Sequence, residues 1–121
     1  MAQMRELDPA LNEVRLIGTV SDTPEERTLP SGDVLAVCRV VVRRDRVRLR
    51  ADGRRGPSVD VVDCAAWAAR PRRSLSGWVA GDLVEIQGTL RRRFYRSDGR
   101  AVSRVEVEVR SARRVRRAAA G

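Results

Sequence analysis

The chain of 121 residues is long enough for one domain and too short for two independent hydrophobic cores. Its 25 basic residues, all of them Arg, outnumber the 16 acidic residues and give a net charge of +9, which favours an anionic partner: nucleic acid first, an acidic membrane surface second. Because it has no His and no Cys-x-x-Cys pair, the composition argues against a zinc site and His-based catalysis, and we expect no metal and no cofactor.

Residues 1–11 are predicted to be an N-terminal extension that precedes the domain. The first ten, MAQMRELDPA, contain two acidic residues and no apolar run. They have neither the pattern of a signal peptide nor that of a membrane span, so we expect a cytoplasmic protein.

Residues 12–42 predict two strands joined by turns. Apolar and polar residues alternate from residue 13 to residue 20, which is the period of a half-buried strand, and a second alternating run ends at residue 42. The Pro-Glu pair at residues 24–25 and the Pro-Ser-Gly-Asp run at residues 30–33 have turn chemistry. Gly18, inside the first strand, predicts a bend or a close backbone approach at a barrel corner.

The next segment, residues 43–58, contains seven Arg and ends in Gly and Pro, so it predicts a long, positively charged loop. Residues 59–67 are apolar enough to form a core strand. We expect Cys64 in this strand and Cys38 in the preceding one to be buried, reduced thiols, with a disulfide or redox role as the alternative.

Residues 70–79 can form a short helix. Leu75, Trp78 and Val79 would point inward from it, and the Gly-Asp pair at residues 81–82 would end it.

Two further strands and a tail complete the pattern. Residues 83–93 form a strand with an internal glycine, and Phe94 and Tyr95 lie at its far end. A hairpin turn at residues 96–99 leads to a strand over residues 101–110, in which Val105, Val107 and Val109 would point inward. Residues 111–121, SARRVRRAAAG, are predicted to be a basic, flexible tail.

Five strands with one short helix between the third and the fourth are the arrangement of the oligonucleotide-binding (OB) barrel, an all-β fold. We therefore predict an OB domain over residues 12–110.

Three segments resemble the bacterial single-stranded DNA-binding protein family in their order and spacing. They are LIGTVSDTPEERTLPSGDVLAVCRV in the first two strands, VDCAAW in the third, and VAGDLVEIQGTLRRRFYRSDGR in the fourth and its hairpin, and they extend over roughly residues 12–109. The resemblance implies sequence-tolerant binding and protection of single-stranded DNA in replication, recombination or repair. It also implies a homotetramer with a nucleoid-associated location.

The family combines a basic groove that follows the phosphates with aromatic faces on which bases stack. By position, the resemblance implies stacking by Trp67 and by Tyr95, with Phe94 beside it. A core position is the alternative for Trp67, and to a lesser degree for Tyr95. Arg46 and Val61 stand where the family often has an aromatic residue, so arginine planes and phosphate neutralisation are expected to contribute more of the binding.

Arginines in two segments are candidates for contacting phosphates. Strand alternation puts Arg92 on the opposite face from Arg91 and Arg93, so one groove cannot take all three. For any single arginine, solvated surface is the alternative. The candidates are Arg43, Arg44, Arg46, Arg48, Arg54 and Arg55 on the long loop, and Arg91, Arg93, Arg96 and Arg100 on the second hairpin.

Family members typically end in a short acidic tip that recruits repair and replication enzymes, whereas this sequence ends in RRVRRAAAG. We therefore expect no recruitment of repair enzymes through an acidic tip. In this respect the chain resembles a shortened paralogue or a form carried by a mobile element.

Two alternative functions stay open at this point. One is a primosome-like OB assembly module that binds a protein partner, and the other is an RNA-binding OB domain, because contacts to 2′-hydroxyl groups leave no motif. An enzyme is not expected, since the chain has no His and no phosphate loop, and Asp60 and Asp63 share neither a strand face nor a recognisable partner.

Overall fold

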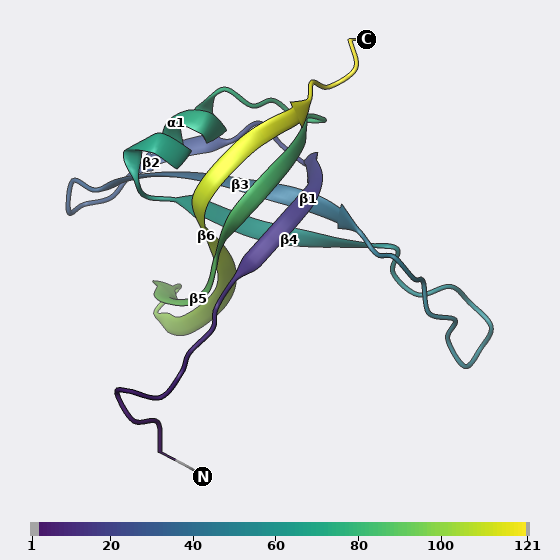
Figure 1. Cartoon of the computed structure of the whole chain (residues 1–121), viewed down its shortest axis with the longest axis horizontal. Coiled ribbons are helices and arrows are strands. Elements are labelled where there is room, and N and C mark those ends of the chain that lie inside the picture. The colour runs from purple at the N-terminus through teal and green to yellow at the C-terminus, as the bar shows by residue number, and fades with distance from the viewer. Residues whose placement is uncertain (1–2, 121) are drawn as a thin grey trace.

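The computed structural model describes residues 3–120, and this part of the chain folds into a closed β-barrel with one helix. Five strands close the barrel in the order β1-β5-β6-β4-β3, with β3 returning to β1, while β2 pairs with β3 outside the closed ring (Figure 1). All pairings are antiparallel except that of β4 with β6. The elements are β1 (Val14–Val20), β2 (Glu25–Thr28), β3 (Val34–Arg43), β4 (Val59–Ala66), α1 (Ala69–Ser76), β5 (Leu83–Ser97) and β6 (Arg100–Arg116).

This architecture confirms the predicted OB barrel, with the helix between the third and fourth barrel strands. The short strand β2 is an addition, because the Pro-Glu pair at residues 24–25 leads directly into a hairpin with β3. Gly32, with a φ of +91°, forms the tight turn of that hairpin, as its position in the Pro-Ser-Gly-Asp run predicts.

The barrel closes where two glycines let backbones approach closely. A Cβ atom at Gly18 would overlap the carbonyl oxygen of Val41 across the β1–β3 contact, and one at Gly88 would overlap that of Glu108 in β6. The β5–β6 register shifts between Gln87 and Gly88, so this glycine marks a bulge. The close approach predicted at Gly18 is confirmed.

Helix α1 covers the core from outside the barrel strands. Leu75 is fully buried and Trp78 is 3% exposed, as predicted. The helix ends earlier than expected, at Ser76 with Gly77 as its C-cap, and Val79 is 50% exposed instead of pointing inward. The backbone N–H of Val79 donates to the Asp82 carboxylate, at 3.0 Å, and this turn after the helix leaves the valine side chain in solvent.

The two cysteines lie opposite each other on β3 and β4, and both are buried, free thiols, as predicted. A hydrogen bond with Cys38 and burial raise the pKa of Cys64 far above its usual range, so this thiol stays protonated and unreactive.

The predicted flexible tail, residues 111–121, is wrong for residues 111–116, because β6 continues through Arg116, and residue 121 lies outside the described residues. Arg113 donates to Glu85 at 2.7 Å, and Arg114 lies 3.3 Å from Asp82, whose carboxylate also accepts the backbone N–H of Ala118 at 2.7 Å. Hydrogen bonds from the backbone N–H groups of Val79 and Ala118 hold the pKa of Asp82 below its usual range, and those from Arg15 and Arg113 do the same for Glu85. Arg113 and Arg114 are therefore paired with β5 and its preceding turn.

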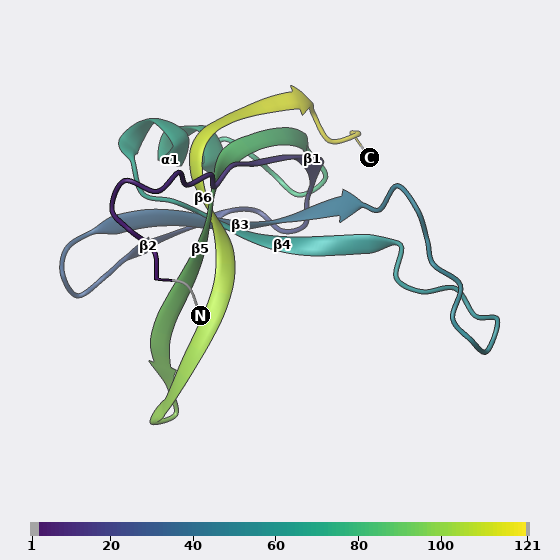
Figure 2. The same ribbon diagram turned by 60° about the horizontal axis from the view of Figure 1, so that its bottom comes forward.

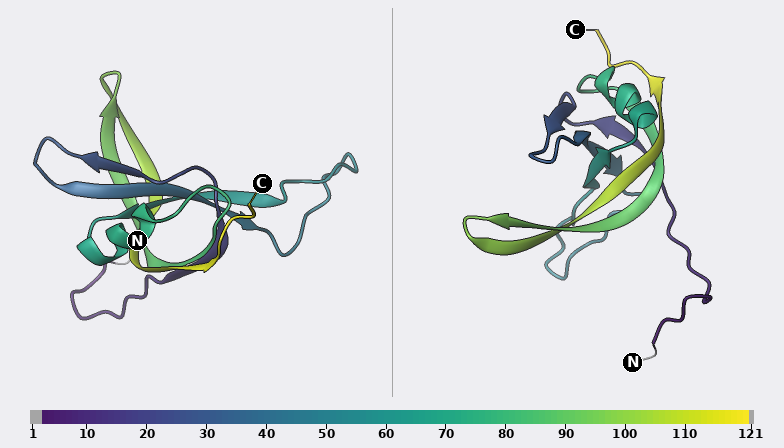
Figure 3. Two further views of the ribbon diagram at one scale, coloured as in Figure 1. Left: turned by 90° about the horizontal axis from the view of Figure 1, so that it is seen from above. Right: turned by 90° about the vertical axis from the view of Figure 1, so that its left-hand side faces the viewer.

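Two hairpins project from the barrel. The β5–β6 hairpin turns at Asp98 and Gly99, both at positive φ, and because it extends past the core, Val105 is 44% exposed instead of pointing inward (Figure 2). The predicted loop between β3 and β4, residues 44–58, projects on the side away from β2 and is called the arm below (Figure 3). Leu49 pairs with Arg55 near the end of the arm.

No helix within residues 3–120 has the length and apolar character needed to span a membrane.

Candidate nucleic-acid interface

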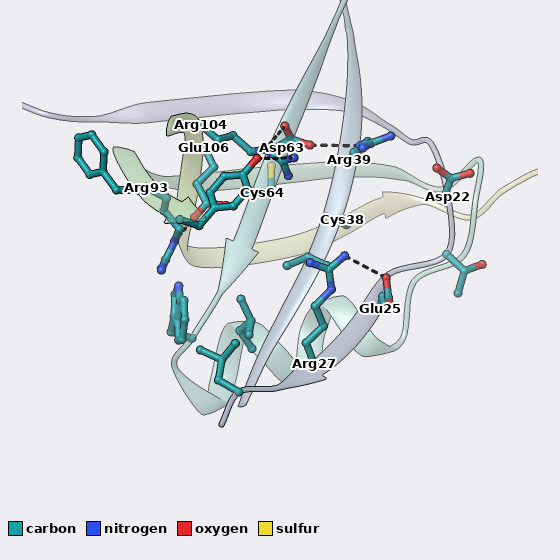
Figure 4. Close-up of a pocket in the computed structure, with 17 residues that line it drawn as sticks. Asp22, Glu25, Arg27, Cys38, Arg39, Asp63, Cys64, Arg93, Arg104 and Glu106 are labelled. Carbon is teal, nitrogen blue, oxygen red and sulfur yellow. Dashed lines mark hydrogen bonds and ion pairs between the residues drawn. The ribbon is translucent and has the colours of Figure 1, made fainter. Parts of the chain in front are cut away.

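A groove of about 550 Å³ lies on the outer surface of the barrel, between β2, β3 and β4 on one side and the β5–β6 hairpin on the other. Side chains of β3 and β4 form its floor, residues 93–95 of β5 together with residues 104 and 106 of β6 form one wall, and β2 forms the other (Figure 4). This is the face on which an OB barrel binds extended ligands.

All three aromatic side chains predicted to stack with bases line the groove. Trp67 is half-buried, whereas Tyr95 is 42% exposed and Phe94 is 78% exposed. The other tryptophan, Trp78, belongs to the core. The structure thus brings together the end of β4 and the part of β5 next to the hairpin turn, which are well separated in the sequence.

Each of two aromatic rings in the groove lies beneath an arginine. The Arg93 guanidinium is 4.2 Å from the centroid of the Trp67 ring and forms an ion pair with Glu106, whose side chain is 10% exposed. The Arg104 guanidinium is 5.6 Å from the Tyr95 centroid and 4.0 Å from a carboxylate oxygen of Asp63. Such cation–π contacts contribute about 0.5–2 kcal/mol.

The remaining arginines of the groove are also paired. Arg27 lies 3.3 Å from Glu25, and Arg39 lies 3.2 Å from Asp63 (Figure 4). Asp22 adds a further carboxylate to the lining. The groove lining is therefore charge-balanced, with four arginines and four carboxylates, and each arginine lies beside a carboxylate.

Sequence reasoning missed Arg27, Arg39 and Arg104 as groove residues. The available signal was strand alternation: Arg39 stands between buried Cys38 and Val40, and must therefore point out of the barrel. Alternation does not predict which of the outward-pointing residues face the β5–β6 hairpin, because that hairpin is distant from β2 and β3 in the sequence.

The six arginines predicted on the long loop lie outside the groove. Arg43 is the last residue of β3, and the others lie on the arm. Arg44 forms a two-pronged pair with Asp60, at 2.8 and 3.1 Å, which holds the pKa of that carboxyl below its usual range. Arg54 lies 4.0 Å from Asp52. Residues 43–58 contain seven arginines and two aspartates, so the arm has a large excess of positive charge.

Of the four arginines predicted on the β5–β6 hairpin, Arg93 alone lines the groove described here. Arg91 lies 3.4 Å from Glu108, Arg96 donates to the Gly99 carbonyl at 3.1 Å, and Arg100 is exposed at the start of β6. Arg92 donates to the Ser103 hydroxyl at 3.1 Å.

Asp60 and Asp63, for which the sequence suggests no partner, both pair with arginines. Val61 between them is 58% exposed, as an outward position of β4. Within residues 3–120, no three His, Cys, Asp or Glu side chains come close enough together to bind a metal ion.

A closed OB barrel with an aromatic-lined groove on its ligand-binding face defines the class of OB-fold binding proteins. The model of the single-strand binding protein family matches residues 11–115, which is most of the chain. The chain therefore belongs to the single-strand binding protein family. A comparison with curated proteins finds no match.

Solved structures share the fold at low sequence identity. The small single-stranded DNA-binding protein from Streptomyces coelicolor is 20% identical, with a TM-score of 0.58 over 84% of this chain and 92% of that one. The Plasmodium falciparum SSB in its complex with ssDNA is 17% identical, with a TM-score of 0.72 over 89% of this chain and 97% of that one. A deletion mutant of the single-stranded DNA binding protein from Thermus aquaticus is 21% identical, with a TM-score of 0.67 over 87% of this chain and 50% of that one.

Proposed function

We propose that this protein binds single-stranded DNA with little sequence preference. The observation that supports this most strongly is the groove, in which Trp67, Phe94 and Tyr95 meet on the ligand-binding face of an OB barrel that belongs to the single-strand binding family. Stacking on such faces tolerates any sequence, because every base has a π-face, and it contributes about 1–3 kcal/mol per base.

The arm supplies the long-range attraction in this proposal. Its arginines are exposed and outnumber its acids, so phosphates that approach it release counterions without displacing many carboxylates. A strand would follow the arm by its phosphates and place bases in the groove. The arginines of the β5–β6 hairpin, Arg91, Arg96 and Arg100, would contact phosphates beside the groove.

The biological role that follows is protection of single strands in replication, recombination or repair, by a non-catalytic, nucleoid-associated protein. We propose that the binding domain spans residues 12–116, which extends the predicted domain to the end of β6. Family membership supports a homotetramer, which light scattering of the intact protein will test.

The proposed function is tested by titrating labelled dT oligomers of increasing length into the protein, beside matched rU oligomers and a duplex of the same length. We expect the dT oligomers to bind most tightly. Tighter binding of rU would favour an RNA-binding domain. Failure of every nucleic acid to bind would favour the assembly module and would contradict the proposal.

A further inference from the structure

The guanidinium over Trp67 occupies the place that a stacking base would take. The Arg93 guanidinium lies over the ring, 4.2 Å from its centroid, and the indole nitrogen Nε1 is buried. The Trp67 carbonyl accepts a hydrogen bond from Arg72 at 2.9 Å, which fixes the backbone there. A base can therefore reach this end of the groove either by displacing Arg93 or by stacking on its outer face.

Glu106 decides between these two routes. The Glu106 side chain is 10% exposed and forms its ion pair with Arg93. Arg91, which lies opposite Glu106 in the β5–β6 register, pairs with Glu108 instead. Displacing Arg93 would leave a buried carboxylate without its partner, which costs on the order of a hundredfold or more in an equilibrium constant. Stacking of one base increases the binding constant by only about fivefold to 150-fold. Displacing Arg93 so that a base can stack on Trp67 therefore increases the affinity little or not at all.

Stacking on the arginine avoids that cost. The Arg93 side chain is 40% exposed, so one face of its plane is available while the other stays on the indole. A guanidinium is planar and stacks on aromatic faces, and its charge also attracts the neighbouring phosphate.

We propose that the guanidinium plane of Arg93, and not the indole of Trp67, is the surface on which a base of the bound strand stacks at this end of the groove. Trp67 supports the plane from below, and Glu106 holds it in place. This inference rests on the proposed function, because it identifies the element of the same groove that contacts the base.

The other covered ring differs from this arrangement. The Arg104 guanidinium is farther from its ring, at 5.6 Å, and its partner Asp63 is 32% exposed and also paired with Arg39. Arg104 can therefore leave without stranding a buried charge, and Tyr95 itself can stack. The two rings of the groove are thus expected to behave differently toward the same ligand.

The first test replaces the plane and keeps the charge. Arg93→Lys retains an ion pair with Glu106 and should weaken dT-oligomer binding about tenfold, without changing the slope of log affinity against log salt. Arg92→Lys, one residue away and outside the groove lining, is the matched control and should bind like the parent. An Arg93→Lys variant as tight as the parent, or an equal loss in Arg92→Lys, would overturn the proposal.

The second test does not depend on Arg93→Lys, because it compares tryptophan fluorescence in the parent protein and in a double variant. Trp78 is buried and gives a constant background, so a change on binding reports Trp67. We expect dT oligomers to quench little fluorescence in the parent and much more in the double variant Arg93→Ala/Glu106→Gln, which uncovers the indole. Strong, equal quenching in both proteins would show direct stacking on Trp67 and would contradict the inference.

These outcomes separate the inference from the proposed function. A parent protein that binds no dT oligomer refutes single-strand binding itself. A parent that binds dT oligomers while Arg93→Lys binds equally well refutes only the assignment of the stacking surface.

Discussion

In the groove each arginine faces a carboxylate, whereas on the arm and its base, residues 43–58, seven arginines are accompanied by two aspartates. The groove contains three aromatic side chains, and the arm contains none. In the proposed complex the two regions would therefore supply the two components of single-strand binding separately.

The difference concerns what a phosphate must displace. In the proposed complex a phosphate on the arm would displace mainly counterions, and the entropy of their release would drive binding. In the groove it must compete with carboxylates that already hold the guanidinium groups in place. We infer that the arm sets the strength and salt dependence of binding, while the groove sets how bases are held.

The largest expected effect concerns a third group of arginines, at the end of β6. If Arg113 and Arg114 are structural, truncation after Arg110 should abolish the cooperative thermal transition, because residues 83–87 of β5 lose their partners on β6, Glu85 loses one of its two arginines and Asp82 loses Arg114. Circular dichroism melting checks this, with truncation after residue 118 as the control that keeps all these contacts. A shorter protein that melts like the parent would place this segment beside the arm as a binding surface.

The next largest effect is expected on the arm. Replacing Arg46, Arg48, Arg54 and Arg55 with Gln should weaken binding of a long dT oligomer several hundredfold at about 0.1 M salt, since each phosphate contact contributes about fivefold there. Anisotropy titration measures the loss. Arg70→Gln/Arg73→Gln, which removes exposed charges from α1, is the control and should change affinity far less. A loss no larger than in this control would break the distinction between groove and arm.

A smaller effect is expected in the groove. Tyr95→Ala should cost about 1–3 kcal/mol of single-strand affinity, because one stacking face is lost. The melting temperature should stay near that of the parent, since the side chain is 42% exposed. Tyr95→Phe keeps the ring and should bind like the parent. An unfolded Tyr95→Ala variant, or one with parental affinity, would remove this residue from the interface.

The smallest expected effect on binding is that of pH. Both regions use arginine and the chain has no His, so affinity should be flat from about pH 6 to 9. Stability should behave differently in acid. The pKa values of Asp82 and Glu85 are lowered in the folded state. Their contribution to the free energy of unfolding is therefore present above about pH 4 and is lost as the pH falls below that value and the carboxylates become protonated. Melting curves at pH 7 and pH 3.5 test the second statement, and binding titrations test the first.

Much of the barrel could be predicted, because its signals are local. Gly18, the alternation of β1 and the turn at residues 30–33 each depend on neighbouring residues. The true extent of β6 could not be predicted, since residues 111–116 contain three arginines and few apolar side chains. They form a strand because β5 supplies partners and Glu85 and Asp82 accept their arginines, and these contacts join residues about 30 positions apart.

The site follows the same pattern. The sequence indicates Trp67, Phe94 and Tyr95 through the family resemblance, and the structure places all three in one groove. The sequence gives no indication that Arg93 covers Trp67, because that contact requires three strands to meet: the end of β4, the part of β5 near the hairpin, and β6 at Glu106.

The division of roles between groove and arm is tested most directly by salt titrations of dT-oligomer affinity in three proteins: the parent, the four-arginine arm variant and Tyr95→Ala. We predict that the arm variant lowers the slope of log affinity against log salt by about 0.7 for each phosphate contact removed. Tyr95→Ala should give a line parallel to that of the parent and displaced to weaker binding. A parental slope in the arm variant, together with a reduced slope in Tyr95→Ala, would contradict the account.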